Sequence, residues 1–423
     1  VEGITFKNCA LNVLSNQTSS LFDPVYITNT ATPTSNFLFE GNTMRGGYYG
    51  IYLSGSASLA GSNPVNRPTN FVFLNNRISD VYYYGAYIYG TNGTQFIGNQ
   101  VDMRTVGTTT TASYGVYAYY NGNSATQAFK FNNNQIRGWQ NYGAYFYYFN
   151  AYPKESPTST WYGHPYGMVS EINGNLIPGS GLTVPAQAFY GMGMRSVNMY
   201  HNTFLTIAAS FALQINTTTT YRTDSCNIRN NTLMTKTAAV MTNSATLPAG
   251  NYPLWANVDS FSIVGPNNYY VIDFPEDTSR ALANIEGSMF GANPLSSRFY
   301  YRKDSSFTNL SLIRNSASYN VSQGITSLTN PIPADGCLNG VNLGVGADIN
   351  GVTRNVLGPD MGAFEVPTAT NDAQVYSIPS PTNGSPGSQN VVAKIKNNGS
   401  VNITSVTMKF SLNGGAATTE TFT

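Results

Sequence analysis

Short stretches of alternating apolar and polar residues recur along the first part of the chain, and most of them share one six-residue phrase. Each copy has an apolar residue, an asparagine three positions later, and a second apolar residue two positions after that. The copies are FEGNTM (39–44), FLNNRI (73–78), FIGNQV (96–101), FNNNQI (131–136), INGNLI (172–177), MYHNTF (199–204) and IRNNTL (228–233). An alternation of period two predicts short strands rather than helices.

The centre of each phrase predicts a sharp bend. The residue before the shared asparagine is Gly, Asn or His, which are types that tolerate left-handed backbone. A strand, a bend and a strand make the corner of a coil, and stacked coils place equivalent strands in parallel ladders about 4.8 Å apart. The shared asparagines are Asn42, Asn76, Asn99, Asn134, Asn175, Asn202 and Asn231. We expect them to form an inward-turned column whose amides bond the bend backbone and one another. The alternative is that Asn only favours turns here.

A second phrase follows the first four shared asparagines. It reads YGIYL (49–53), YGAYIY (84–89), YGVYAY (114–119) and YGAYFY (142–147), with YGMGM (190–194) as a weaker copy. If the small or branched residue after each glycine points inward, two columns of tyrosine point outward. They are Tyr52, Tyr87, Tyr117 and Tyr145 in one column, and Tyr89, Tyr119 and Tyr147 in the other.

Two registered phrases per repeat favour an all-β parallel β-helix over a β-propeller, because the repeats are 23 to 41 residues apart and propeller spacing is more even. The phrases resemble the right-handed parallel β-helix repeats of the pectate-lyase-like superfamily, of its carbohydrate-binding and sugar-hydrolase type, up to about residue 290. The string GPDMGAFEV (358–366) resembles the signature that ends many secreted bacterial β-helices. The resemblance implies a β-helix over 1–366, in which 291–366 is the closing region.

The remaining chain predicts a second domain. A linker at 367–371 precedes residues 372–423, which resemble the start of a cell-adhesion-related Ig-like β-sandwich of bacterial surface proteins. Both ends of the sequence fall within strand patterns, so we expect it to be part of a longer, secreted chain.

Composition narrows the class of protein. Only 10% of the residues are charged and 13% are aromatic, whereas ordinary soluble domains carry roughly 25% charged residues. This favours an extracellular β protein. The net charge of +1, without a basic cluster, argues against nucleic acid as a partner. No apolar run is long enough to span a membrane. Cys9, Cys226 and Cys337 are far apart and odd in number, so we expect three small buried residues.

Candidate catalytic groups are few. Arg77, Asp102 and Arg137 fall near one another in the repeat register, where a polysaccharide lyase would use an Arg base and acids that hold Ca²⁺. Attraction between charges on neighbouring strands explains the same pattern, and no second column of acids supports glycoside hydrolysis. His201 occupies a bend position, and His164 lies beside Trp161 in a long insertion. We therefore expect neither a metal site nor a cofactor.

The outward tyrosines are the best candidate site. Contiguous exposed aromatic surface usually marks an interaction site, and Tyr presents a flat apolar ring and a hydroxyl. The hypothesis is a cell-surface adhesin or structural segment that binds a glycan or another surface protein through these columns and Trp161. Self-stacking of the rings or cover by a loop is the structural alternative. A polysaccharide lyase or glycoside hydrolase and a purely mechanical stalk are the functional alternatives.

Overall fold

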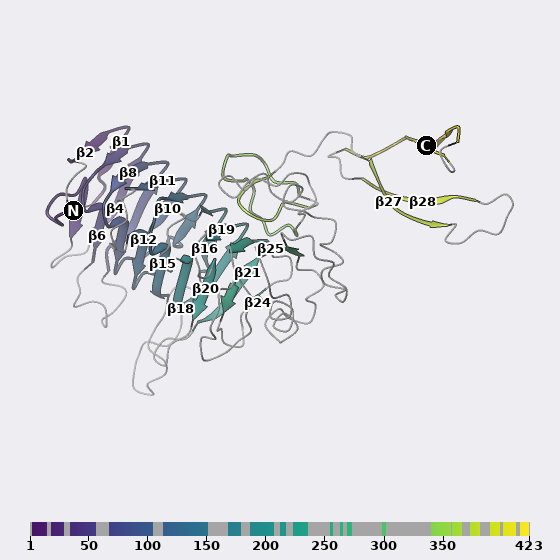
Figure 1. Cartoon of the computed structure of the whole chain (residues 1–423). Coiled ribbons are helices and arrows are strands. Elements are labelled where there is room, and N and C mark those ends of the chain that lie inside the picture. The colour runs from purple at the N-terminus through teal and green to yellow at the C-terminus, as the bar shows by residue number, and fades with distance from the viewer. Residues whose placement is uncertain are drawn as a thin grey trace, which may run out of the picture. The chain divides into compact units, whose positions relative to one another are not determined.

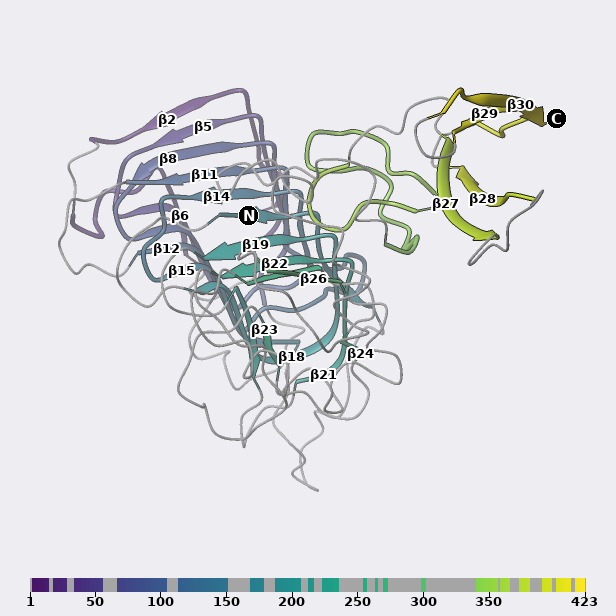
Figure 2. The same cartoon turned by 45° about the vertical axis from the view of Figure 1, so that its right-hand side comes forward.

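The chain winds through three ladders of parallel strands in the computed structural model (Figures 1 and 2). The described residues form strands and no helix. The structure describes residues 2–14, 18–28, 34–55, 67–104, 113–150, 168–178, 187–206, 212–216, 223–235, 254–256, 263–264, 269–272, 298–301, 340–356, 358–365, 373–380, 390–397, 401–411 and 415–422. It divides into two compact units, Val1–Glu365 and Val366–Thr423.

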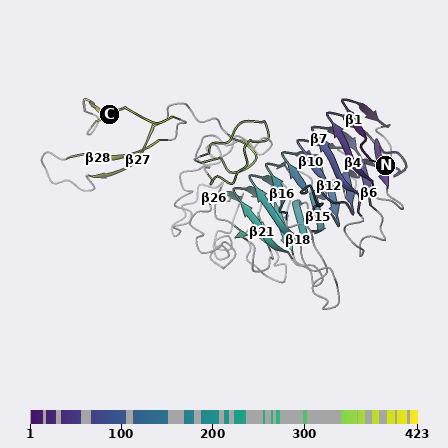
Figure 3. The ribbon, with the colours of Figure 1, turned by 180° about the vertical axis from the view of Figure 1, so that it is seen from behind.

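Each coil of the first unit contributes one strand to each ladder. Ladder A contains β1 (Thr5–Lys7), β4 (Ser35–Glu40), β7 (Thr69–Leu74), β10 (Gln95–Ile97), β13 (Lys130–Asn132), β16 (Ser170–Asn173), β18 (Gln187–Tyr200), β21 (Asp224–Arg229) and β24 (Ile263–Val264), and Figure 3 shows several of these strands side by side. The strands of this ladder begin the six-residue phrases. Their apolar first residues therefore lie in register from coil to coil.

Ladder B follows ladder A after the bend. It contains β2 (Ala10–Asn12), β5 (Thr43–Arg45), β8 (Arg77–Val81), β11 (Gln100–Met103), β14 (Gln135–Arg137), β17 (Leu176–Ile177), β19 (Thr203–Thr206), β22 (Thr232–Thr235), β25 (Tyr269–Ile272) and β26 (Arg298–Tyr301). Parallel pairing thus continues to β26, past residue 290.

Ladder C carries the YG phrases. It contains β3 (Val25–Thr28), β6 (Tyr49–Ser54), β9 (Tyr84–Tyr89), β12 (Tyr114–Tyr119), β15 (Tyr142–Phe149), the first part of β18, β20 (Leu213–Asn216) and β23 (Leu254–Ala256). Strand β18 belongs to two ladders, because Phe189 to Met192 pair with β20 and Arg195 to Tyr200 pair with β21. Ladders A and C therefore join at this coil.

Apolar side chains from all three ladders fill the interior of the stack. Phe39, Phe73, Phe96 and Phe131 are buried and form one continuous row, with ring centroids 5.0–6.0 Å apart. The inward residues of ladder C, such as Ile51 and Val116, are also fully buried. Burial of apolar area on this scale is the main stabilising term of the fold.

The bends between ladders A and B have left-handed backbone, as the residue types predict. The residue before each shared asparagine has a φ between 53° and 67°, at Gly41, Asn75, Gly98, Asn133, Gly174, His201 and Asn230. This conformation turns the chain through the corner with a single residue.

The seven shared asparagines form one buried column, here called the asparagine column. Each Oδ1 after the first accepts two hydrogen bonds from the preceding asparagine, one from its backbone NH at 2.9–3.0 Å and one from its Nδ2 at 2.9–3.3 Å. Each Nδ2 also donates to a backbone carbonyl of the preceding coil, as Asn134 does to Phe96 at 2.8 Å. The amides thus satisfy their own polar groups and those of the bend.

The cysteine prediction is wrong at one position. Cys9 takes the asparagine position in the first coil, and its backbone NH donates to Asn42 Oδ1 at 2.8 Å, but the residue is exposed. Among the described strands, β1 pairs only with β4 and β2 only with β5. Cys226 is buried in the core, and Cys337 lies outside the described residues.

The second unit contains two antiparallel strand pairs. Strand β27 (Ala373–Ser380) pairs with β28 (Val392–Asn397), and β29 (Val406–Phe410) pairs with β30 (Thr418–Phe422). Antiparallel pairing distinguishes this unit from the parallel ladders of the first. The predicted linker at 367–371 lies outside the described residues.

Truncation of one amide in the middle of the asparagine column tests its energetic role. In Asn134→Ala, the NH and Nδ2 groups of Asn99 lose an acceptor and the carbonyl of Phe96 loses a donor. A buried polar group without a partner costs about 1–3 kcal/mol, so we expect the free energy of unfolding to fall by about 2–4 kcal/mol. Denaturant unfolding measures it. Asn12→Ala, at an exposed position of β2, is the matched control, and an equal loss in both variants would contradict the prediction.

Candidate functional site

The outward side of ladder C carries three parallel columns of tyrosine, here called the tyrosine face. The central column is Tyr26, Tyr52, Tyr87, Tyr117, Tyr145 and Tyr190; one flanking column is Tyr49, Tyr84, Tyr114 and Tyr142, and the other is Tyr89, Tyr119 and Tyr147. The register pairs each tyrosine with its equivalent in the next coil, so the columns follow directly from the strand pairing.

The central column is a continuous stack of rings. Successive centroids are 4.6, 5.2, 5.3, 5.0 and 4.9 Å apart, and the first four pairs of ring planes are within 8° of parallel. Tyr26, at one end, is 58% exposed, whereas Tyr190, at the other end, is only 8% exposed. Tyr52, Tyr87 and Tyr117 between them are partly buried. Contacts of this geometry are worth about 0.5–1.5 kcal/mol per pair beyond area burial.

The stacking corrects the expectation that flat ring faces are presented to a ligand. Because Tyr87 lies between Tyr52 and Tyr117 in nearly parallel planes, its two faces contact neighbouring rings. Only its edge and its hydroxyl are left for other contacts. The tyrosine face is therefore a set of hydroxyl rows at the coil spacing, separated by apolar ring edges.

Glycine in the YG phrase is required by a close approach between ladders. A Cβ at Gly85 would collide with Val101 Cγ1 and with the carbonyl oxygen of Gly115, and a Cβ at Gly115 would collide with Ile136 Cγ2. Residues of ladder B thus press against the start of each ladder C strand. This contact fixes the strands under the tyrosine face.

The tyrosine face is uncharged. Burial raises the pKa of Tyr117 to about 12, and the neighbouring phenols of Tyr114 and Tyr147 contribute to the shift. Burial likewise raises the pKa of Tyr49 and of Tyr119 to about 12, and that of Tyr87 further. Ionisation is suppressed because each phenolate would form among other rings with little water around it. The tyrosine face therefore offers neutral hydrogen-bonding groups rather than charges.

The structure places the alternative catalytic residues on the outward side of ladder B. Asp102 pairs with Arg137 in the strand register, and Arg77 occupies a neighbouring column beside Gln100. Asp102 accepts a hydrogen bond from Gln100 at 2.8 Å, and Arg137 donates to Gln135 at 3.1 Å. The two charged side chains are thus held by amides of their own strands.

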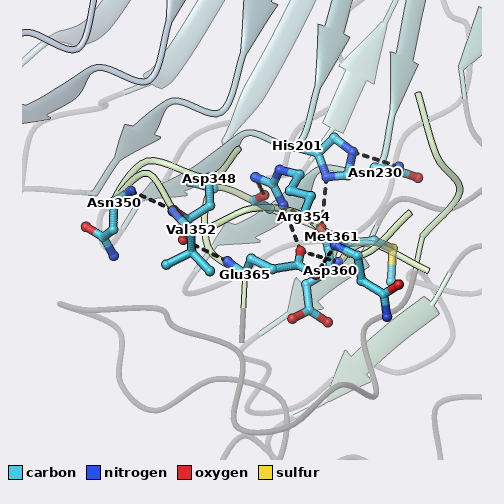
Figure 4. Close-up of polar contacts among 12 residues, drawn as sticks. His201, Asn230, Asp348, Asn350, Val352, Arg354, Asp360, Met361 and Glu365 are labelled. Carbon is cyan, nitrogen blue, oxygen red and sulfur yellow. Dashed lines mark hydrogen bonds and ion pairs between the residues drawn. The ribbon is translucent and has the colours of Figure 1, made fainter. Parts of the chain in front are cut away.

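Of the three other positions that the sequence analysis singled out, only His201 is among the described residues. Trp161 and His164 lie outside the described residues. His201 has the predicted left-handed bend, but it also contacts a distant part of the chain. That part is residues 340–365, here called the closing segment, which packs on the coils that contain Leu176, Thr203 and Thr232 (Figure 4).

A buried polar network holds the closing segment in shape. Arg354 donates to the carbonyls of Asp360 and Gly362 at 3.1 and 2.9 Å, and to Glu365 Oε2 at 3.3 Å. Glu365 in turn accepts from the backbone NH groups of Asn355 and Asp360 at 2.9 and 2.8 Å. Arg354 and Glu365 thus each have several partners, as a buried charge requires.

Three further bonds attach this segment to the stack. Gly362 NH donates to the carbonyl of Asn230 at 2.7 Å, and Ala363 NH donates to Thr203 Oγ1 at 2.8 Å. His201 Nδ1 lies 2.8 Å from the carbonyl of Asp360. Because a carbonyl only accepts, this nitrogen carries the proton, and Nε2 accepts from Asn230 Nδ2 at 3.1 Å. The neutral ring therefore links the bend to the closing segment.

The network is buried, as a structural role requires. Asp348, Arg354, Asp360 and Glu365 are each at most 6% exposed, and His201 is fully buried. The sequence carries a signal for it at the position after the shared asparagine. That position is polar at Thr43, Arg77, Gln100, Gln135, Thr203 and Thr232, and among the seven phrases it is apolar at Leu176 alone, which packs against Ala363 and Phe364 of the segment.

Comparison with known proteins leaves the family open: the models of known protein families give no match, and no curated protein matches the sequence. Within the described residues there is no helix of the length and apolarity needed to cross a membrane. Nor do three or more His, Cys, Asp or Glu side chains in the described part of the chain gather as a metal site would require.

Acid should release the closing segment through His201. Burial, helped by nearby Arg354, lowers the pKa of His201 from 6.5 to about 3. The unfolded chain therefore takes up a proton that the folded chain refuses, and stability falls as pH drops from about 6.5 towards 3. At about 1.36 kcal/mol per pH unit, the loss between pH 7.5 and 4.5 is about 3 kcal/mol.

His201→Asn isolates this effect, because Asn occupies the same left-handed position at Asn75, Asn133 and Asn230. The variant retains Arg354 and Glu365, so their titration is common to both proteins. We expect the variant to lack the acid-dependent loss when unfolding free energies are compared across this range. Parallel pH profiles for the two proteins would show that the ring does not couple the segment to the stack.

Proposed function

We propose that the three ladders form a right-handed parallel β-helix of a secreted bacterial surface protein, and that the second unit begins an Ig-like module. The parallel register of successive coils supports the first part. The antiparallel pairs β27–β28 and β29–β30 support the second. Low charge and abundant uncharged polar groups favour an extracellular location.

We further propose that the protein is an adhesin or structural segment whose tyrosine face binds an uncharged glycan chain. The observation that carries the proposal is the unbroken six-ring column from Tyr26 to Tyr190, in steps of 4.6–5.3 Å. A surface that repeats at every coil offers equivalent contacts to a partner that is itself a repeating polymer. Many weak, equivalent contacts add through effective concentration.

The chemistry of the surface favours a glycan over a charged partner. Phenol hydroxyls both donate and accept hydrogen bonds, as sugar hydroxyls do, and the raised pKa values keep them neutral. The apolar ring edges between the rows suit the C–H groups of a sugar ring. Binding without turnover is the expected activity, because the face itself is built from phenols and carries no pair of carboxylates.

Two triple variants separate the hydroxyls from the stack. Changing Tyr87, Tyr117 and Tyr145 to Phe retains the rings and removes three hydroxyls, and changing them to Ser removes both. We expect at least ten-fold weaker binding in each, measured as retention on a panel of immobilised neutral polysaccharides. The control changes the ladder B residues Thr43, Gln100 and Gln135 to Ser and should bind normally.

Retention of the wild-type chain on none of these polysaccharides would refute the glycan proposal. Unchanged retention of the Ser variant, with its fold verified by circular dichroism, would also refute it. Loss in the Ser variant alone would assign the binding to the rings rather than to the hydroxyls.

A further inference from the structure

The central column of the tyrosine face keeps its hydroxyl groups free, whereas each flanking column uses some of its own within the protein. Tyr114 accepts a hydrogen bond from Asn141 Nδ2 at 3.4 Å, and Tyr147 donates to Tyr148 at 2.7 Å. The central hydroxyls without a hydrogen-bond partner in the described part of the chain, here called the open hydroxyl row, are those of Tyr52, Tyr87, Tyr117 and Tyr145. None of them is among the buried polar atoms that lack a partner, so each reaches the surface.

The open hydroxyl row is evenly spaced along the stacking axis. Its rings are parallel to within 5°, and successive centroids are 5.2, 5.3 and 5.0 Å apart. The strand register gives the four side chains the same outward direction, so their hydroxyls recur at about the same step. Because the ladder fixes the coils about 4.8 Å apart, this step is a rigid property of the fold.

A partner that contacts the whole row must repeat at this step along a straight line. In an extended β-1,4-linked chain of pyranose sugars, each sugar advances the chain by nearly the same distance. One sugar therefore lies over each coil when the chain runs along the stacking axis. Successive sugars are turned over relative to one another, so alternate edges of the chain meet the row. Both edges carry hydroxyls, which donate to and accept from phenol hydroxyls equally well.

The rigidity of the row discriminates between linkages. Tyr87 is held between the rings of Tyr52 and Tyr117, so its hydroxyl cannot move to follow a curved ligand without breaking the stack. An α-1,4-linked glucan coils, and its sugars leave a straight line within a few units. Such a chain contacts only part of the row, whereas an extended chain contacts all of it. Selectivity is the difference between these two affinities.

We infer that the tyrosine face selects an extended, neutral β-1,4-linked glycan that runs along the stacking axis with one sugar over each coil. The inference rests on the proposed glycan-binding function, to which it adds the linkage and the direction of the ligand. Because the row extends from Tyr52 to Tyr145 in consecutive coils, a disaccharide fills only part of it. Linked contacts add through effective concentration, so affinity should increase with chain length until the row is filled.

Calorimetric titration of the full 423-residue chain with defined oligosaccharides tests linkage and length. The ligands are cellohexaose and β-1,4-linked mannohexaose, their disaccharides cellobiose and mannobiose, and maltohexaose. Cellohexaose and maltohexaose have the same composition and differ only in linkage, so they form a matched pair. We expect at least one β-1,4-linked hexaose to bind at least ten-fold more tightly than maltohexaose and than its own disaccharide.

A single-residue variant locates the binding. Tyr117→Phe removes one hydroxyl from the middle of the open hydroxyl row and retains the ring in the stack, so we expect the hexaose to bind about five-fold more weakly. Tyr200→Phe makes the same change on ladder A, in strand β18, outside the tyrosine face. This control should bind the hexaose as the wild-type chain does.

The outcomes separate this inference from the proposed function. Maltohexaose binding as tightly as both β-1,4-linked hexaoses would overturn the inference alone, as would a disaccharide that binds as tightly as its hexaose. Equal affinities of Tyr117→Phe and Tyr200→Phe would place the sugar away from the row and also overturn it. Retention on immobilised neutral polysaccharides without binding of either β-1,4-linked hexaose would overturn the inference and leave the proposed function in place. Failure of the wild-type chain to bind any oligosaccharide or polysaccharide would refute both.

Discussion

The fold depends on hydrogen bonding by a buried primary amide. Asn alone has two donors and an acceptor on a side chain short enough to bond the backbone of the bend and the equivalent amide in the next coil. This arrangement sets the height and the register of every coil from Asn42 to Asn231. Register decides which residues face outward, since a shift by one residue exchanges the two sides of a strand. The hydroxyl rows on ladder C are therefore a consequence of amides on the opposite corner.

Much of this arrangement can be predicted from the sequence, because strand alternation and the fixed distance from amide to strand define the coil locally. The left-handed bends and two of the tyrosine columns follow from residue type and spacing alone. The third column, Tyr49 to Tyr142, stands in the same phrases, yet its outward direction depends on the close glycine contacts that follow it. The orientation of the rings cannot be predicted from the sequence either, because the packing of neighbouring rings determines the side-chain torsion angles.

The closing segment shows a different limit. Its contacts join residues about 160 positions apart, such as Ala363 and Thr203, and no local pattern specifies such a pairing. The string GPDMGAFEV marks the segment, but the partners of Asp360 and Glu365 are revealed only by the docked structure. Contacts between the repeats and this distant segment therefore cannot be predicted from the repeat pattern alone.

The direction of the ladder hydrogen bonds has a mechanical consequence. Because the strands of each ladder succeed one another from coil to coil, their inter-strand bonds run along the stacking axis. Tension along that axis acts first on the few hydrogen bonds that hold the terminal coil. When those bonds break, the next coil bears the load. The coils therefore detach one at a time. Each released coil lengthens the chain, and this lowers the peak force on an attached molecule. A segment built in this way would extend and dissipate energy under tension rather than transmit the force as a rigid rod does.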